Sequence, residues 1–127
     1  MSKTVVHIDD DKFLLNMYDI KLRRAGCDVY PFQTFDSKIV EGIAKCKPDI
    51  IVSDIVHDPK DLDGVELCRQ MQKDERLKDV PFVFLSNTLG YLKKVDISDL
   101  KIAKKIEKAT TQPDEVVSQI LGTIQVN

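Results

Sequence analysis

Two short apolar runs that lead directly into aspartates constrain this chain more than any other feature. Residues 5–8 run into three consecutive aspartates, residues 9–11, and residues 50–53 run into Asp54. Runs of this length and composition are typical of strands buried in a parallel sheet. Parallel strands end at the same edge of a sheet, which is where open α/β folds bind their ligands. The sequence therefore predicts an acidic site, suited to a hard cation such as Mg²⁺, at the carboxyl edge of an α/β sheet.

The remainder of the chain alternates between strand-like and helix-like patterns. The strand-like patterns cover residues 3–8, 27–32, 49–53, 80–85 and 101–107. Helical patterns cover residues 12–25, a segment that starts at Asp36 or Ser37, residues 65–73, and a segment that starts at Thr111. Strand–helix units repeated in this way predict a parallel sheet with right-handed crossovers and helices on both faces.

The helical patterns also predict which side chains face the core. The expected inward residues are Phe13, Leu14, Met17, Ile20 and Leu22 in the first helix, and Leu67, Cys68 and Met71 in the third. Asp11 is expected to cap the first helix. Residues 88–100 are ambiguous, because their apolar spacing favours a short helix that Gly90 weakens.

Composition favours one domain in a reducing compartment. With 127 residues, of which 43% are hydrophobic, the chain is long enough for a single core, and we expect one domain over residues 1–127. A net charge of −2 provides no general attraction to nucleic acid or anionic membrane. Cys27, Cys46 and Cys68 include no CxxC pair, which favours free thiols in the cytoplasm. We expect neither a signal peptide nor a membrane-spanning segment.

Residues at the ends of four predicted strands resemble those of the receiver domains of two-component response regulators. The matching residues are the pair Asp9 and Asp10, Asp54, Ser86 and Lys108, which follow the first, third, fourth and fifth strands. The resemblance extends over essentially the whole chain and favours the stand-alone, single-domain type. It implies a flavodoxin-like, doubly wound sheet of five parallel strands in the order 2-1-3-4-5.

The resemblance implies a phosphoacceptor role for Asp54. In the family, the aspartate at this position takes a phosphoryl group from the phosphohistidine of a sensor histidine kinase. Mg²⁺ offsets the repulsion between the carboxylate and the anionic phosphoryl group. By resemblance, the metal ligands are Asp10, Asp54 and the backbone carbonyl of Val56. Asp9 is expected to act on the metal mainly through water.

Lys108 and Ser86 are expected to contact the phosphoryl group. The ammonium of Lys108 supplies a point charge for the phosphoryl oxygens. Ser86 hydrogen-bonds the group, and its movement is the usual switch of the family. Taken alone, each residue has an ordinary interpretation: Lys108 as a surface lysine, Ser86 as a loop serine and Asp54 as the end of a strand. Their joint occurrence at the ends of the predicted strands favours a functional site. Asp63 and Gly64 match the family's Asp-Gly turn, where glycine relieves a backbone constraint.

Three features depart from the family's pattern. The loop of residues 57–62 is longer and more acidic than usual, which changes the entrance to the predicted site. Asn87 stands where a small residue is common, so its amide can screen the phosphoryl group from water or donate to it. Lys105 stands where an aromatic switch residue is usual, and Ala109 replaces a proline. These departures put the usual output mechanism in question, but not phosphoryl acceptance.

The expected output surface is formed by residues 88–100, the fifth strand and the last helix. It carries Lys93, Lys94, Lys101, Lys104 and Lys105. One interpretation is a solvated basic face, and the other is a docking face for an acidic downstream protein or for a second copy in a homodimer. Nucleic-acid binding is not expected, because no arginine or aromatic residue is interleaved with these five lysines.

Three other classes of function are weighed against this one. A phosphorylation-independent, receiver-like scaffold is favoured by Lys105 and the long loop. A phosphatase with an aspartyl intermediate would need an acid where Val56 stands, and a nucleotide-binding flavodoxin-like protein would not place acids at residues 9–11. We therefore expect no turnover of a separate substrate. His7 is interpreted as a satisfied core or edge histidine, and His57 as a solvated loop residue.

Overall fold

The chain forms a parallel five-stranded sheet, seen in a computed structural model that describes residues 2–55 and 63–124. The strands are β1 (Thr4–Ile8), β2 (Asp28–Phe32), β3 (Ile50–Ser53), β4 (Phe82–Ser86) and β5 (Lys104–Glu107). They lie in the order β2-β1-β3-β4-β5, and each neighbouring pair is parallel. The predicted strand order and direction are confirmed.

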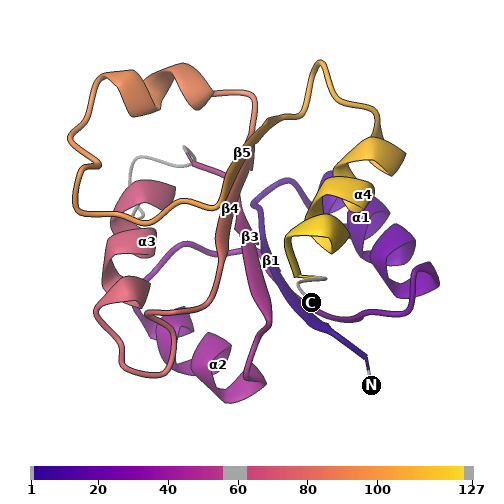
Figure 1. Cartoon of the computed structure of the whole chain (residues 1–127), viewed down its shortest axis with the longest axis horizontal. Helices are drawn as coiled ribbons and strands as arrows, with labels where there is room; N and C mark the ends of the chain where they lie inside the picture. Colours follow the sequence, from indigo (N-terminus) through magenta and orange to yellow (C-terminus); the bar gives the residue numbers. More distant parts are fainter. Residues whose placement is uncertain (1, 56–62, 125–127) are drawn as a thin grey trace.

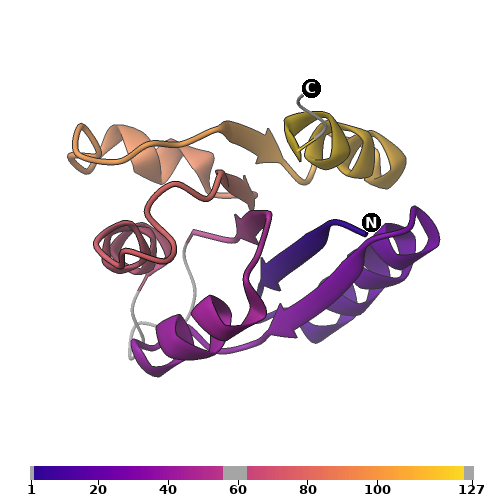
Figure 2. The same ribbon diagram turned by 60° about the horizontal axis from the view of Figure 1, so that its bottom comes forward.

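Helices cover both faces of this sheet (Figures 1 and 2). The helices are α1 (Lys12–Arg24), α2 (Lys38–Cys46), α3 (Gly64–Gln72) and α4 (Pro113–Ile124), with a short 3₁₀ helix, η1 (Leu89–Lys93). Figure 1 shows α1 and α4 together on one face, and α2 and α3 together on the other. The doubly wound architecture is therefore also confirmed.

The sheet has a hydrophobic core on each face, because neighbouring strand residues point to opposite sides. On β4, Phe82 and Phe84 belong to the core beneath α2 and α3, whereas Val83 and Leu85 belong to the core beneath α1 and α4. A strand covered on both faces must be apolar at every position. This requirement explains why the central strands are continuous apolar runs.

The predicted inward face of α1 is only partly right. Leu22 is buried as predicted, but Phe13 is 78% exposed and Ile20 is 43% exposed, and Leu15 and Tyr18 are buried in their place. Both sets of residues have helical spacing, so periodicity alone does not distinguish them. Packing of the helix in the fold decides between them, and it turns Leu15 and Tyr18 inward.

The stretch between β4 and β5 agrees with expectation only in part. Its first residues form the short helix that the apolar spacing favoured, as η1, but β5 begins at Lys104 rather than at residue 101. Side chains of α3 bind the backbone of this stretch instead. The amide of Gln72 donates to the carbonyl of Lys101 at 2.7 Å and accepts from its N–H at 3.0 Å. Polar groups that a helix would satisfy internally are thus satisfied by a neighbouring element.

Predictions about helix ends and thiols fare better. Asp11 caps α1 as expected, because its side chain accepts hydrogen bonds from the first backbone N–H groups of the helix. Of the two expected caps of α2, Ser37 makes no capping bond, whereas the side chain of Asp36 accepts the backbone N–H of Lys38 at 2.9 Å. Cys27, Cys46 and Cys68 are free thiols, of which Cys46 is only partly buried. None of the described helices is long and apolar enough to cross a membrane.

A pair of matched substitutions tests the rotation of α1. Leu15→Ala removes a buried side chain on the inward side of α1 and is expected to lower the free energy of unfolding by about 2–5 kcal/mol. Phe13→Ala removes an exposed ring and is expected to change it by about 0.5 kcal/mol or less. Urea unfolding of both variants measures the difference. A large loss of stability in Phe13→Ala would contradict the outward orientation of the Phe13 side chain.

Candidate functional site

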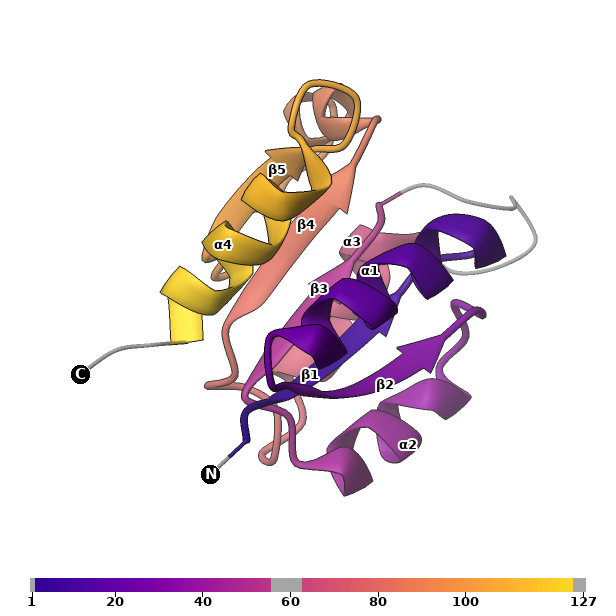
Figure 3. The same cartoon turned by 90° about the vertical axis from the view of Figure 1, so that its right-hand side faces the viewer.

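The carboxyl ends of four strands bring the predicted site residues to one edge of the sheet. Asp9 and Asp10 follow β1, Asp54 follows β3, Ser86 ends β4 and Lys108 follows β5. The strand arrows run in one direction, so these ends share an edge (Figure 3). One carboxylate oxygen from each of the three aspartates lies within 4.8 Å of the others. The edge therefore carries the acidic cluster that the sequence predicts.

Asp9 is the buried member of this cluster. It is 0% exposed, and its Oδ1 accepts a hydrogen bond from the backbone N–H of Asp11 at 2.9 Å. Its Oδ2 accepts a hydrogen bond from Nζ of Lys108 at 2.5 Å. Burial raises the pKa of Asp9, and the hydrogen bonds from Lys108 and Asp11 offset this only in part. A carboxylate in this environment needs a cation beside it to remain charged.

Lys108 supplies a cation to two of the aspartates. Its Nζ lies 2.5 Å from Oδ2 of Asp9 and 3.5 Å from Oδ2 of Asp54. Burial lowers the pKa of Lys108, but the hydrogen bonds and charges of these two carboxylates outweigh that effect, so the pKa is raised overall. The backbone N–H of Lys108 donates to the carbonyl of Ser86 at 3.2 Å, which fixes its main chain beside the end of β4. The ammonium therefore stays charged at neutral pH.

Asp10 and Asp54 are the accessible members of the cluster. Asp10 is exposed, and the side chain of Asp54 is 12% exposed. Oδ1 of Asp54 accepts the backbone N–H of Ile55 at 2.7 Å, which fixes the orientation of the carboxylate. Two accessible carboxylates with a third behind them are hard oxygen donors of the kind that Mg²⁺ prefers, so the residues fit the predicted metal. Val56 and the loop of residues 57–62 lie outside the described residues.

Ser86 and Asn87 form hydrogen bonds with residues of the loops that follow β4 and β5. Ser86 is fully buried, and its Oγ lies 2.8 Å from Oγ1 of Thr88 and accepts the backbone N–H of Thr88 at 3.0 Å. The side chain of Asn87 accepts the backbone N–H of Ala109 at 2.7 Å. Asn87 therefore links the loop after β4 to the loop after β5. The contact with Thr88 was not predicted, although a hydroxyl two residues after a serine is a common turn partner.

Gly64 is required by a close approach to the main chain of Asp54. A Cβ atom at Gly64 would overlap the carbonyl oxygen of Asp54 and lie 2.8 Å from Cα of Ile55. The N–H of Gly64 also donates to the carbonyl of Ile55. Asp63, just before it, caps α3 by accepting the N–H of Glu66 at 2.8 Å. The predicted Asp-Gly turn is therefore present, and it holds the start of α3 against the backbone of Asp54.

His7 lies in β1, two residues before Asp9, and is almost fully buried. Its Nδ1 lies 3.3 Å from Oδ1 of Asp19, and its ring packs edge-on against Tyr18 at 5.9 Å between centroids. Its Nε2 has no hydrogen-bond partner among the described residues. The expectation of a fully satisfied histidine is therefore wrong for one of the two ring nitrogens. Asp19 was not expected inside, because it is a charged residue that was not in the predicted apolar face of α1.

Comparison with known sequences shows partial relationships, one of them with a transcriptional regulator. No protein-family model matches the sequence. The DNA-binding dual master transcriptional regulator RpaA of Synechocystis sp. is 34% identical over 83 residues, which make up 65% of this chain. The matched part spans only 33% of that relative's length.

Comparison with solved structures defines the fold. The chemotaxis response regulator CheY4 of Vibrio cholerae superimposes with a TM-score of 0.81 at 18% identity, over 97% of this chain and 99% of that one. The non-phosphorylated receiver domain of HemR from Leptospira biflexa superimposes with a TM-score of 0.78 at 22% identity, over 99% and 97% of the two chains. The chain therefore has the fold of a response-regulator receiver domain, as its sequence indicated.

Metal binding by the acidic cluster can be tested by thermal unfolding with and without Mg²⁺. At a concentration ten times the dissociation constant, Mg²⁺ is expected to stabilise the native protein by about 1.4 kcal/mol. Asp10→Asn removes an accessible ligand and should abolish most of this increment. Asp79→Asn is the matched control, because Asp79 is an exposed carboxylate that precedes β4 at the opposite edge of the sheet. Equal increments in both variants would contradict a metal site at this cluster.

Proposed function

We propose that the chain is the receiver domain of a two-component response regulator, and that Asp54 accepts a phosphoryl group from a sensor histidine kinase in a Mg²⁺-dependent reaction. The observation that carries the proposal is the cluster of Asp9, Asp10 and Asp54 with Lys108 at the carboxyl edge of the sheet. The receiver fold supports it independently. The proposed domain covers residues 1–127 and acts as a single unit.

In the proposed reaction, a carboxylate oxygen of Asp54 attacks the phosphorus of a phosphohistidine. A P–O bond forms while the P–N bond breaks, and the imidazole of the kinase leaves with the electron pair and gains a proton. Mg²⁺ would be held by Asp10, Asp54 and the carbonyl of Val56, with Asp9 behind them, and would offset the charge of the incoming group. Hydrolysis restores the carboxylate and releases inorganic phosphate. The domain thus turns over no separate substrate.

Lys108 is proposed to contact the oxygens of the transferred group. Its position supports this role, because Nζ lies 3.5 Å from Oδ2 of Asp54 and is held there by Asp9. An ammonium that is already desolvated needs little reorganisation when negative charge arrives. Lysine suits this position as a compact point charge with three donors.

Ser86 is proposed to sense the phosphoryl group by exchanging hydrogen-bond partners. Its hydroxyl is at present bound to the side chain and the N–H of Thr88. When Ser86 donates its proton to a phosphoryl oxygen, it can no longer donate to Oγ1 of Thr88, although its oxygen can still accept hydrogen bonds. Thr88 stands at the N-cap of η1, so the exchange would alter the start of this element.

The proposed partners are the kinase and a downstream protein that reads the phosphorylated state through η1, β5 and α4. This surface carries the exposed side chains of Lys93, Lys94, Lys101, Lys104 and Lys105. Their charge favours an acidic partner protein, with a homodimer as the alternative. Neither nucleic acid nor membrane is proposed as a partner. Free thiols agree with a cytoplasmic location.

Phosphoryl acceptance can be tested with Mg²⁺ and acetyl phosphate, followed by intact mass. The native protein is expected to gain one phosphoryl group, because the small donor replaces the phosphohistidine. Asp54→Asn should gain none, and Asp79→Asn should behave like the native protein. Loss of the product on removal of Mg²⁺ is also expected.

Two outcomes would contradict the proposal. Equal phosphorylation of Asp54→Asn would move the acceptor elsewhere. An absence of product in a folded, Mg²⁺-binding native protein would favour the phosphorylation-independent scaffold, whose interactions would then centre on the lysine-rich surface.

A further inference from the structure

Side chains along the length of α3 form hydrogen bonds with the stretch between β4 and β5. Near the middle of α3, the guanidinium of Arg69 binds both carboxylate oxygens of Asp99, at 2.7 and 3.2 Å, and donates to the carbonyl of Asp96 at 3.0 Å. At the end of the helix, Gln72 makes its two bonds with the backbone of Lys101. Figure 1 shows the stretch passing alongside α3 on its way to β5.

A third hydrogen-bonded contact joins the start of α3 to η1. The hydroxyl of Tyr91 donates to Oδ2 of Asp63 at 3.0 Å, while Oδ1 of the same carboxylate caps α3. The hydrogen bond to Asp63 raises the pKa of Tyr91, so the phenol remains a donor at neutral pH. The ring of Tyr91 packs against the core beneath α2 and α3. The hydroxyl can therefore be removed without removing the ring from its packing position.

The same end of α3 is in contact with the main chain of Asp54. The missing side chain of Gly64 lets the helix start lie against the carbonyl oxygen of Asp54 and Cα of Ile55. No flexible side chain separates the two backbones at this point. A shift of the main chain at Asp54 must therefore either move the start of α3 or deform the backbone there.

We infer that Tyr91 couples the main chain at Asp54 to η1 through Asp63 and Gly64, so that α3 and the stretch after β4 respond together to the state of Asp54. The inference rests on the proposed function and names the regulation of that site. Tyr91 is a positioning residue in this scheme, because it acts through Asp63 rather than on the reacting atoms.

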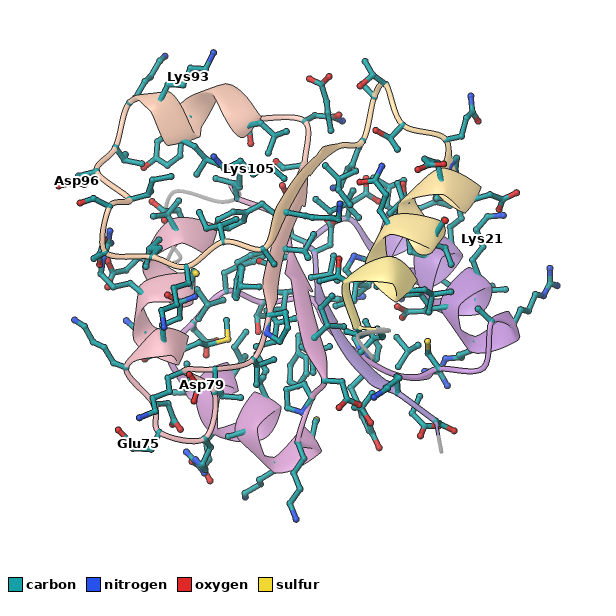
Figure 4. The ribbon with its side chains drawn as sticks, in the orientation of Figure 1. Lys21, Glu75, Asp79, Lys93, Asp96 and Lys105 are labelled. Atoms are coloured by element: carbon teal, nitrogen blue, oxygen red, sulfur yellow. The ribbon has the colours of Figure 1, made fainter. Side chains whose placement is uncertain are left out.

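The coupling would compensate for the absence of an aromatic residue at position 105. Lys105 is an exposed side chain of β5 and offers no ring to follow Ser86. η1 and the stretch after it carry Lys93, Lys94 and Lys101, so a movement transmitted by α3 would reposition three of the five surface lysines. Figure 4 shows Lys93 at the outer end of η1, directed away from the sheet.

The test compares Tyr91→Phe with the native protein in amide NMR, with beryllofluoride and Mg²⁺ used to imitate the phosphoryl group. Loading of the site is read independently from the fluorine signal of bound beryllofluoride. In the native protein, the amides of Gly90, Leu92 and Lys93 are expected to shift on loading. In Tyr91→Phe, the site should bind beryllofluoride equally well. The chemical-shift changes of the η1 amides should fall to less than about half of those in the native protein.

Tyr30→Phe is the matched control, because it removes a phenol hydroxyl from the exposed ring of β2. It should load and shift like the native protein. If Tyr91→Phe loads and its η1 amides shift as in the native protein, the coupling through Tyr91 is wrong while the proposed function stands. If beryllofluoride loads none of the three proteins, the phosphoacceptor assignment fails and the coupling fails with it.

Discussion

The site depends on the balance between three carboxylates and one ammonium at the edge of the sheet. Asp9 is fully buried, and its charge is tolerable only because Lys108 lies against it. The same ammonium lies 3.5 Å from Oδ2 of Asp54, so the two aspartates share one counter-charge. Asp10 is left facing solvent. The cluster is therefore short of positive charge, and a divalent cation is the natural complement.

The parallel sheet determines which residues share this balance. A right-handed crossover returns each strand to the same direction, so every strand delivers its next residues to one edge. Residues 9, 54 and 108 are far apart in the sequence, yet their side chains meet within hydrogen-bonding distance. The backbone bond between Lys108 and Ser86 continues the pairing of β4 with β5 beyond the strands. The geometry of the site is thus a direct consequence of strand register.

The parts predictable from the sequence were those controlled by chain direction and strand composition. The apolar runs located β1 and β3, and the acids that follow them located the edge on which the cluster lies. The orientation of α1 was not predictable in this way, because Phe13 and Leu15 both belong to apolar sets with helical spacing. Tertiary packing decides between such sets, and Leu15 is the one that packs inward.

The stretch after β4 was beyond prediction for a different reason. Its backbone groups are satisfied by Gln72 and Arg69, whose partners lie 27 to 30 residues away in the sequence. No local pattern encodes such pairings. The receiver-fold structures of 18% and 22% identity share the sheet with this chain. The polar contacts of Asp63, Arg69 and Gln72 with the stretch after β4 arise from this chain's own side chains, and they offer a route from Asp54 to the lysine-rich surface.

The assignment of Asp54 as phosphoacceptor is tested most directly by locating the modified residue. An acyl phosphate formed with acetyl phosphate can be reduced with borohydride, which converts a phosphorylated aspartate to homoserine, and the product can be placed by peptide mass spectrometry. The assignment predicts homoserine at position 54 alone, and only when Mg²⁺ was present during the reaction. Homoserine at Asp9 or Asp10 instead, or none in a protein that binds Mg²⁺, would contradict it.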